Sequence, residues 1–124
     1  MKTFILFTPD AIAPCPETKN PSSGAVITFS GVVRDHEDTG TISSLFYEAY
    51  QPMAENIMRK ILNELSSRYP CTSVEVVHRF GSIPVGETSL WIRVHASHRA
   101  EAFGLLTHFI DQMKKDVPIW KTKP

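Results

Sequence analysis

The chain has 124 residues, a length that suits one domain, and we expect a single domain over residues 1–124. Apolar residues make up 42% of the chain, which is enough for a hydrophobic core. Lysine plus arginine equal aspartate plus glutamate, at 13 each, so the composition predicts no nucleic-acid or membrane partner, and any basic site must be local. Cys15 and Cys71 form no CxxC motif. This spacing predicts neither a disulfide framework nor a zinc site, and it fits a reducing cytoplasm.

The first half of the chain predicts three strands. The start, MKTFILFTPD, has an apolar run of only four residues, too short for a signal peptide or a membrane span, and favours a strand over Lys2–Thr8. Pro9–Ser23 is rich in proline and serine and predicts a loop. Gly24–Arg34, GAVITFSGVVR, is β-branched and apolar and predicts a largely buried strand. Asp35–Thr41 predicts an exposed loop, and Ser43–Tyr50 a third strand.

A helix should follow, because Pro52 suits a first helical turn and Tyr69-Pro70 would end it. Its apolar face is expected to be Met53, Ile57, Ile61, Leu62 and Leu65.

Two more strands and a second helix complete the predicted order. The strands Ser73–Phe80 and Ser89–Ala96 are expected to join through a hairpin at residues 83–86. The last helix should begin near His98 and end by Val117, because Pro118 disfavours helix at the residue before it. Its inner face is expected to be Ala102, Phe103, Leu106, Phe109, Ile110 and Met113. The order β-β-β-α-β-β-α predicts an α+β domain with an antiparallel sheet and two main helices.

The stretch SHRAEAF, residues 97–103, lies where the last strand meets the last helix. If His98 is the N-cap, Glu101 is at the third helical position, and His98 and Arg99 project beside the helix N-terminus. Such an end attracts anions, and a guanidinium adds a fork that fits phosphate. The alternative is a capped helix with a solvated arginine and an incidental histidine, and this stretch alone favours that alternative.

The stretch MKKDVPIWK, residues 113–121, carries two lysines of interest. Lys114 lies on the last helical turn, Pro118 redirects the chain, and Trp120 can act as an anchor that holds Lys121. A frayed, charged C-terminus is the alternative. Because residues 117–120 are too apolar to be simply solvated, we expect them to pack on the domain or on a partner.

Arg34 ends the second predicted strand in GVVRDH, residues 31–36, and is either a functional cation or an ordinary boundary residue. We interpret His36 as exposed, and His78 and His108 as ordinary surface or packed histidines. His95 and His98 form an HxxH motif across a strand end, without a third ligand nearby, so a metal site is not expected. The sequence contains no GxGxxG, GxxxxGK[ST] or GxSxG motif.

Four motifs in order, GAVITFSGVVRDH, HRFGSIPVGE, SHRAEAF and MKKDVPIWK, resemble the large, catalytic subunit of molybdopterin synthase over Gly24–Lys121. The resemblance implies an α/β hammerhead-type fold and a homodimer. Each protomer would bind a small ubiquitin-like sulfur carrier ending in Gly-Gly, which makes a heterotetramer. Sulfur would pass from the carrier's thiocarboxylate to cyclic pyranopterin monophosphate, a pterin phosphate, with no metal and no cofactor.

The resemblance also implies a set of site residues. Lys121 and Lys114 match the family's lysines at the carrier tail and would be catalytic. The implied substrate-binding residues are Val32, Val33, Arg34, His98, Arg99, Lys114, Lys121, Thr122 and Lys123. Lys123 stands where the family usually has an acidic residue, and the family usually continues beyond this point. Lys123 is therefore a weaker expectation than Lys121, and the alternative function is a non-catalytic homologue that binds the carrier tail. Whether one site draws on both protomers is left open by the sequence.

Overall fold

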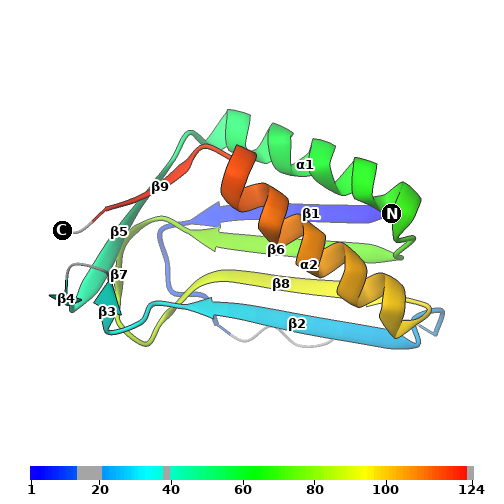
Figure 1. The fold of residues 1–124 in the computed structure, drawn as a ribbon, viewed down its shortest axis with the longest axis horizontal. Helices are drawn as coiled ribbons and strands as arrows, with labels where there is room; N and C mark the ends of the chain where they lie inside the picture. The colour runs from blue at the N-terminus through cyan, green and yellow to red at the C-terminus, as the bar shows by residue number, and fades with distance from the viewer. Residues whose placement is uncertain (14–20, 38–39, 123–124) are drawn as a thin grey trace.

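The main sheet has four strands and carries most of the hydrophobic core. In the computed structural model, which describes residues 1–13, 21–37 and 40–122, the strand order is β1-β6-β8-β2 (Figure 1). The strands are β1 (Lys2–Thr8), β6 (Ser73–Arg79), β8 (Thr88–Ala96) and β2 (Ala25–Val32). β8 pairs antiparallel with β6 and β2, as expected, but β1 pairs parallel with β6. The sheet is therefore mixed, because the chain between β1 and β6 includes a crossover helix.

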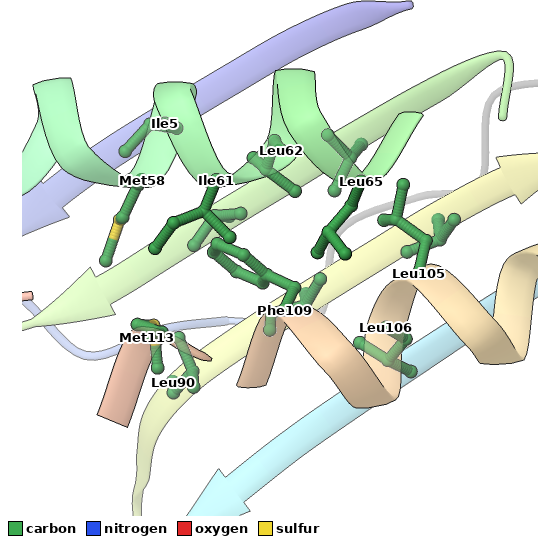
Figure 2. Packing of buried hydrophobic residues seen from close by; sticks show 14 of the residues in the cluster. Ile5, Met58, Ile61, Leu62, Leu65, Leu90, Leu105, Leu106, Phe109 and Met113 are labelled. Carbon is green, nitrogen blue, oxygen red and sulfur yellow. The ribbon is translucent and has the colours of Figure 1, made fainter. Parts of the chain in front are cut away.

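Two helices of 18 residues cover one face of this sheet. α1 (Gln51–Arg68) has Pro52 in its first turn, and α2 (Arg99–Asp116) begins directly after its N-cap residue His98. Figure 2 shows Phe109 of α2 and Ile61 of α1 pointing toward one another above the sheet. The sheet contributes alternate residues, because successive strand side chains point to opposite faces; these include Ile5, Val74, Val76, Leu90, Ile92 and Val94.

The helix faces differ at their edges from those that the spacing predicts. In α1, Met53 is 49% exposed, whereas Ala54 and Met58 are fully buried. In α2, Phe103 is 55% exposed and Leu105 is fully buried instead. The other predicted inner-face positions are buried or half-buried, so the difference is confined to edge positions of the apolar stripes. The spacing predicts these edge positions wrongly because apolar residues also occupy the helix faces on either side of the buried stripe.

A second, three-stranded sheet lies at one end of the main sheet, with the order β7-β5-β9 (Figure 1). It consists of β7 (Gly81–Pro84), β5 (Ser44–Ala49) and β9 (Ile119–Thr122). β7 overlaps the hairpin predicted at residues 83–86, so the link between β6 and β8 contributes a strand to the second sheet. The short strands β3 (His36–Glu37) and β4 (Gly40–Thr41) pair inside the predicted loop 35–41. A small core of Val33, Leu45 and Ile83 supports this end.

β2 is an edge strand, and this placement overturns the expectation of a largely buried strand. Its residues alternate between half-buried and exposed, because one face packs on the core and the other does not. A register irregularity between Gly31 and Val32 ends the regular pairing with β8. Arg34 therefore lies beyond the strand rather than at its last residue.

Within the described ranges, α1 and α2 lack the length of uninterrupted apolar sequence that a membrane-crossing helix needs. Cys71 is a free thiol, and Cys15 lies outside the described residues.

Candidate functional site

A cavity of about 860 Å³ opens where the C-terminal end of α2 meets the second sheet. One part of its wall is apolar and comes from α2, β2, β8 and the start of β9. The other part is polar and comes from β5, β6, β9, the segment after β2, the last turn of α2 and the start of β8. The lining residues are Phe29, Gly31, Val32, Arg34, Tyr47, His78, Ser89, Leu90, Ile110, Met113, Lys114, Val117, Ile119, Trp120 and Lys121.

Three cations from distant parts of the sequence line this cavity. Arg34 follows the end of β2 and is exposed at the cavity wall. Lys114 lies in the last turn of α2, where a positive charge also suits the helix dipole. Lys121 lies on β9. No residue in the described segments forms an ion pair with Arg34 or Lys114, so both charges are available to an anionic ligand.

Lys121 is held by backbone pairing and by an ion pair. β9 pairs antiparallel with β5 in a register that places Lys121 opposite Tyr47. The Lys121 Nζ atom lies 3.1 Å from Oε1 of Glu37 on β3. Trp120 does not bury its ring: it is 55% exposed at the cavity, so the expectation that it anchors Lys121 is wrong. The strand pairing does this instead, and Val117 is the residue of the segment that is buried.

Two neutral polar side chains of the cavity, Tyr47 and His78, were not predicted as site residues. His78 is 4% exposed, and its ring contacts that of Tyr47 with centroids 5.5 Å apart. Burial lowers the pKa of His78, so the imidazole is neutral at neutral pH. The sequence signal was the polar pair His78-Arg79 at the end of an apolar strand, but strand ends commonly carry polar residues.

The neighbours of Arg34 differ in what they offer to a ligand. Val32 is half exposed and lines the cavity. Val33 has a buried side chain; its N–H donates to the Glu87 carbonyl, and its own carbonyl accepts from the Gly86 N–H. Thr122 ends β9, and Lys123 lies outside the described residues.

His98 and Arg99 lie away from this cavity. Both are exposed at the N-terminus of α2, and His98 makes no side-chain capping hydrogen bond. A helical rise of about 1.5 Å per residue puts Lys114 roughly 22 Å along the axis from Arg99. Figure 1 shows the C-terminal end of α2 leading into β9, and its N-terminal end near the far ends of β8 and β2. The structure therefore brings Val32, Arg34, Lys114 and Lys121 together, and places His98 and Arg99 elsewhere.

The remaining histidines give no sign of a metal centre. The described residues contain no group of three histidine, cysteine or carboxylate side chains arranged to hold a metal ion. His36 is exposed as expected and pairs with Asp35, which lowers the pKa of that carboxyl. His95 is buried in β8, and His108 stacks on Tyr69.

The cavity is suited to binding an anion that is attached to a larger ring. Its cations supply charge, and its apolar wall lowers the local dielectric constant, which strengthens charge interactions. Its neutral polar groups can recognise hydrogen-bonding edges of a ring.

Known proteins resemble this chain in both sequence and fold. The sequence model of the MoaE protein family matches residues 8–116. The molybdopterin synthase catalytic subunit of Thermoplasma volcanium is 35% identical over 98% of this chain and 90% of its own length. That of Rattus norvegicus is 43% identical over 82% of this chain. The chain spans about half the length of the rat and human relatives.

Solved structures of molybdopterin synthase and of molybdopterin-converting factor share the fold of this chain. The crystal structure of molybdopterin synthase from Staphylococcus aureus has a TM-score of 0.84 and 31% identity, covering 95% of this chain and 88% of that one. A complex of subunits 1 and 2 of molybdopterin-converting factor from Helicobacter pylori has a TM-score of 0.70 and 25% identity, covering 82% and 66%. The family match spans most of the chain, and the fold agrees over nearly all of it. The chain therefore belongs to the MoaE protein family.

Proposed function

We propose that this protein is the catalytic subunit of a molybdopterin synthase. It would transfer sulfur from a thiocarboxylated ubiquitin-like carrier to cyclic pyranopterin monophosphate, in the cytoplasm. The observation that carries the proposal is the meeting of Arg34, Lys114 and Lys121 at one cavity with an apolar wall. The names of the sequence relatives support it.

The reaction needs this cluster of cations because both reactants are anionic. A thiocarboxylate must approach a pterin that carries a cyclic phosphate, and their repulsion grows as water is excluded. At an effective dielectric constant of 20, two unit charges about 4 Å apart interact by roughly 4 kcal/mol. Cations fixed in the cavity offset this cost without reorganising during the reaction.

The lysines would act at the carbonyl carbon of the carrier's last glycine. The thiocarboxylate sulfur first bonds to a side-chain carbon of the pterin and displaces the oxygen substituent there, which leaves with the electron pair of the carbon–oxygen bond. Water then adds to the carbonyl of the resulting thioester, and the bond between the carbonyl carbon and the sulfur breaks. The sulfur stays on the pterin, and the carrier leaves as a carboxylate. Lys121 or Lys114 would stabilise the oxyanion of the tetrahedral intermediate, because each places an ammonium group at the cavity.

The proposed partners are the carrier and a second copy of this chain. The Helicobacter pylori neighbour is described as a complex of two different subunits, which supports a small partner here. The half-exposed Trp120 beside Lys121 offers an apolar contact for an incoming tail. Because His98 and Arg99 lie far from Lys114 on the same helix, they can join this substrate site only from the other protomer of a dimer.

The decisive test is single-turnover incubation with thiocarboxylated carrier and cyclic pyranopterin monophosphate, with an assay for the dithiolene product. Lys121→Ala should reduce sulfur transfer by at least two decades, the magnitude typical for loss of one oxyanion-stabilising group. Lys121→Arg should rescue poorly, because a guanidinium keeps its proton near neutral pH. Lys60→Ala removes an exposed lysine from α1 and is the matched control, with activity like the parent.

Parent-like turnover in both Lys121 variants would refute the catalytic role of this lysine. A parent protein that binds the carrier tail and makes no product would instead favour the non-catalytic, carrier-binding homologue.

A further inference from the structure

His78 is a buried titratable residue at the cavity, and the proposed mechanism does not use it. It lies at the end of β6, where its ring stacks on Phe7 with centroids 6.0 Å apart and meets the Tyr47 ring edge-on. Its side chain is almost fully buried by these contacts, yet it lines the cavity. The ring therefore has a fixed orientation.

The hydrogen bond of His78 defines its tautomer. Nδ1 lies 2.8 Å from the Arg79 carbonyl oxygen, and a carbonyl can only accept, so Nδ1 carries the proton. Since burial keeps the ring neutral, Nε2 has no proton and is an acceptor. Nε2 makes no hydrogen bond with any described residue, and it is not among their fully buried polar atoms that lack a partner. It is therefore open to the cavity.

The neighbours of His78 separate this acceptor from the cations. Tyr47 contacts the His78 ring and stands opposite Lys121 in the β5–β9 pairing. Directly opposed residues of an antiparallel pair project to the same face. Along this part of the cavity wall, Tyr47 therefore lies between the neutral acceptor of His78 and the positive charge of Lys121. A ligand that spans it would place an N–H donor at His78 and an anionic group near Lys121.

We propose that Nε2 of His78 accepts a hydrogen bond from an N–H group of the substrate's heterocyclic ring, and that His78 thereby selects for that ring rather than for its phosphate. This assignment rests on the proposed function, because a pterin carries ring N–H groups and an exocyclic amine. An unprotonated nitrogen gives no attraction to phosphate or thiocarboxylate. Anion binding is left to the cations, and ring recognition to His78.

Three variants separate recognition from packing. His78→Phe keeps an aromatic ring against Phe7 and Tyr47 but removes both nitrogens. His78→Asn retains a donor near the Nδ1 position and loses the reach to Nε2. His78→Gln carries an amide to the Nε2 position and is the conservative rescue.

The test compares two ligands on each variant. The Kd of cyclic pyranopterin monophosphate is measured by fluorescence titration, and the inhibition constant of inorganic phosphate is measured in the sulfur-transfer assay or, without turnover, by competition with the pterin. His78→Phe and His78→Asn should weaken pterin binding about three- to tenfold, the value of one neutral hydrogen bond. Phosphate binding should stay within about twofold, and His78→Gln should recover part of the pterin affinity.

Unchanged pterin affinity in His78→Asn would overturn the inference, as would an equal loss of pterin and phosphate binding, which would indicate a role in shaping the whole cavity. If His78→Phe fails to fold, the Asn and Gln pair decides alone. A parent that binds the pterin but makes no product refutes the proposed function and leaves the His78 test intact, whereas a parent that does not bind the pterin refutes both.

Discussion

The ion pair between Lys121 and Glu37 matters at the scale of single residues, because it occupies a lysine of the candidate site. Nζ and Oε1 are 3.1 Å apart, the Glu37 side chain is 20% exposed and that of Lys121 47%. A half-exposed pair of this kind contributes at most about 1 kcal/mol to stability. Its larger effect is on the cavity, where the carboxylate cancels one of three positive charges in the absence of ligand. Glu37 thus opposes anion binding.

Glu37→Gln should tighten the binding of anionic ligands, because it removes one negative charge and leaves the shape unchanged. We expect a two- to fivefold lower Kd for cyclic pyranopterin monophosphate at low salt, equivalent to roughly 0.4–1 kcal/mol. The gain should shrink as ionic strength rises. Glu55→Gln is the control, because Glu55 also forms an ion pair, with Arg59 on α1, but lies away from this cavity; its side chain is 40% exposed. Equal or weaker binding by Glu37→Gln at low salt would contradict this role for Glu37.

The sequence identifies the cations of the site better than its neutral groups. Arg34, Lys114 and Lys121 belong to recognisable motifs, and the structure places all three at the cavity. Glu37 and His78 escape notice for a physical reason: one lies in a polar loop and the other at a strand end, and both positions often carry polar residues. The relation of Glu37 to Lys121 appears only in their ion pair, and that of His78 only in its edge-on contact with Tyr47, which stands opposite Lys121 in the β5–β9 pairing.

At the scale of elements, a close contact between the C-terminal end of α1 and the face of α2 determines how near the two helices lie. Gly104 faces the ring of Tyr69, the C-cap residue of α1, and a Cβ at position 104 would overlap this ring. Tyr69 in turn stacks on His108 one turn further along α2, with centroids 5.1 Å apart. The glycine therefore allows a contact that an alanine would obstruct.

Gly104→Ala should destabilise the protein although alanine is the better helix former. The propensity gain is about 1 kcal/mol, and overpacking costs about 1–3 kcal/mol, so we expect a net loss of up to about 2 kcal/mol in the free energy of unfolding. Denaturant unfolding measures it, with Thr107→Ala, on the exposed side of the same helix, as the control that shows a gain in helix propensity without overpacking. In a Tyr69→Ala background the same substitution should be neutral or stabilising. If Gly104→Ala lowers the free energy of unfolding equally in the Tyr69→Ala background, the Tyr69 ring is not the cause of the loss.

The elements of the main sheet and both helices follow from local patterns, whereas the second sheet does not. β7 and β9 have four residues each, and both pair with β5, which lies far from them in sequence. Such pairing depends on non-local contacts that no short window contains. The parallel pairing of β1 with β6 has the same origin. Pro118 predicts the end of α2, but not that the chain then returns as a strand.

At the scale of the whole molecule, the predicted site residues fall into two groups that one chain does not unite. Arg34, Lys114 and Lys121 meet at the cavity, and His98 and Arg99 lie at the other end of α2. An 18-residue helix is about 27 Å long, so this separation is inherent in any sequence that puts the two motifs on one straight helix. In a two-fold symmetric dimer, each contact is repeated, and two equivalent sites would each combine groups from both protomers.

Mixing two defective variants tests this arrangement directly. Arg34→Ala and Arg99→Ala should each lose sulfur transfer by about one to two decades, because each removes a charge-assisted hydrogen bond to the substrate. After subunit exchange at equal amounts, about half of the dimers carry one copy of each, and one of their two sites is intact. Single-turnover product should then return to about a quarter of the parent value. Arg34→Ala mixed with Lys121→Ala is the control: both residues belong to one cavity, so every site keeps a defect and no recovery follows. Absence of recovery in the first mixture, with exchange verified by mass spectrometry, would place the complete site within a single chain.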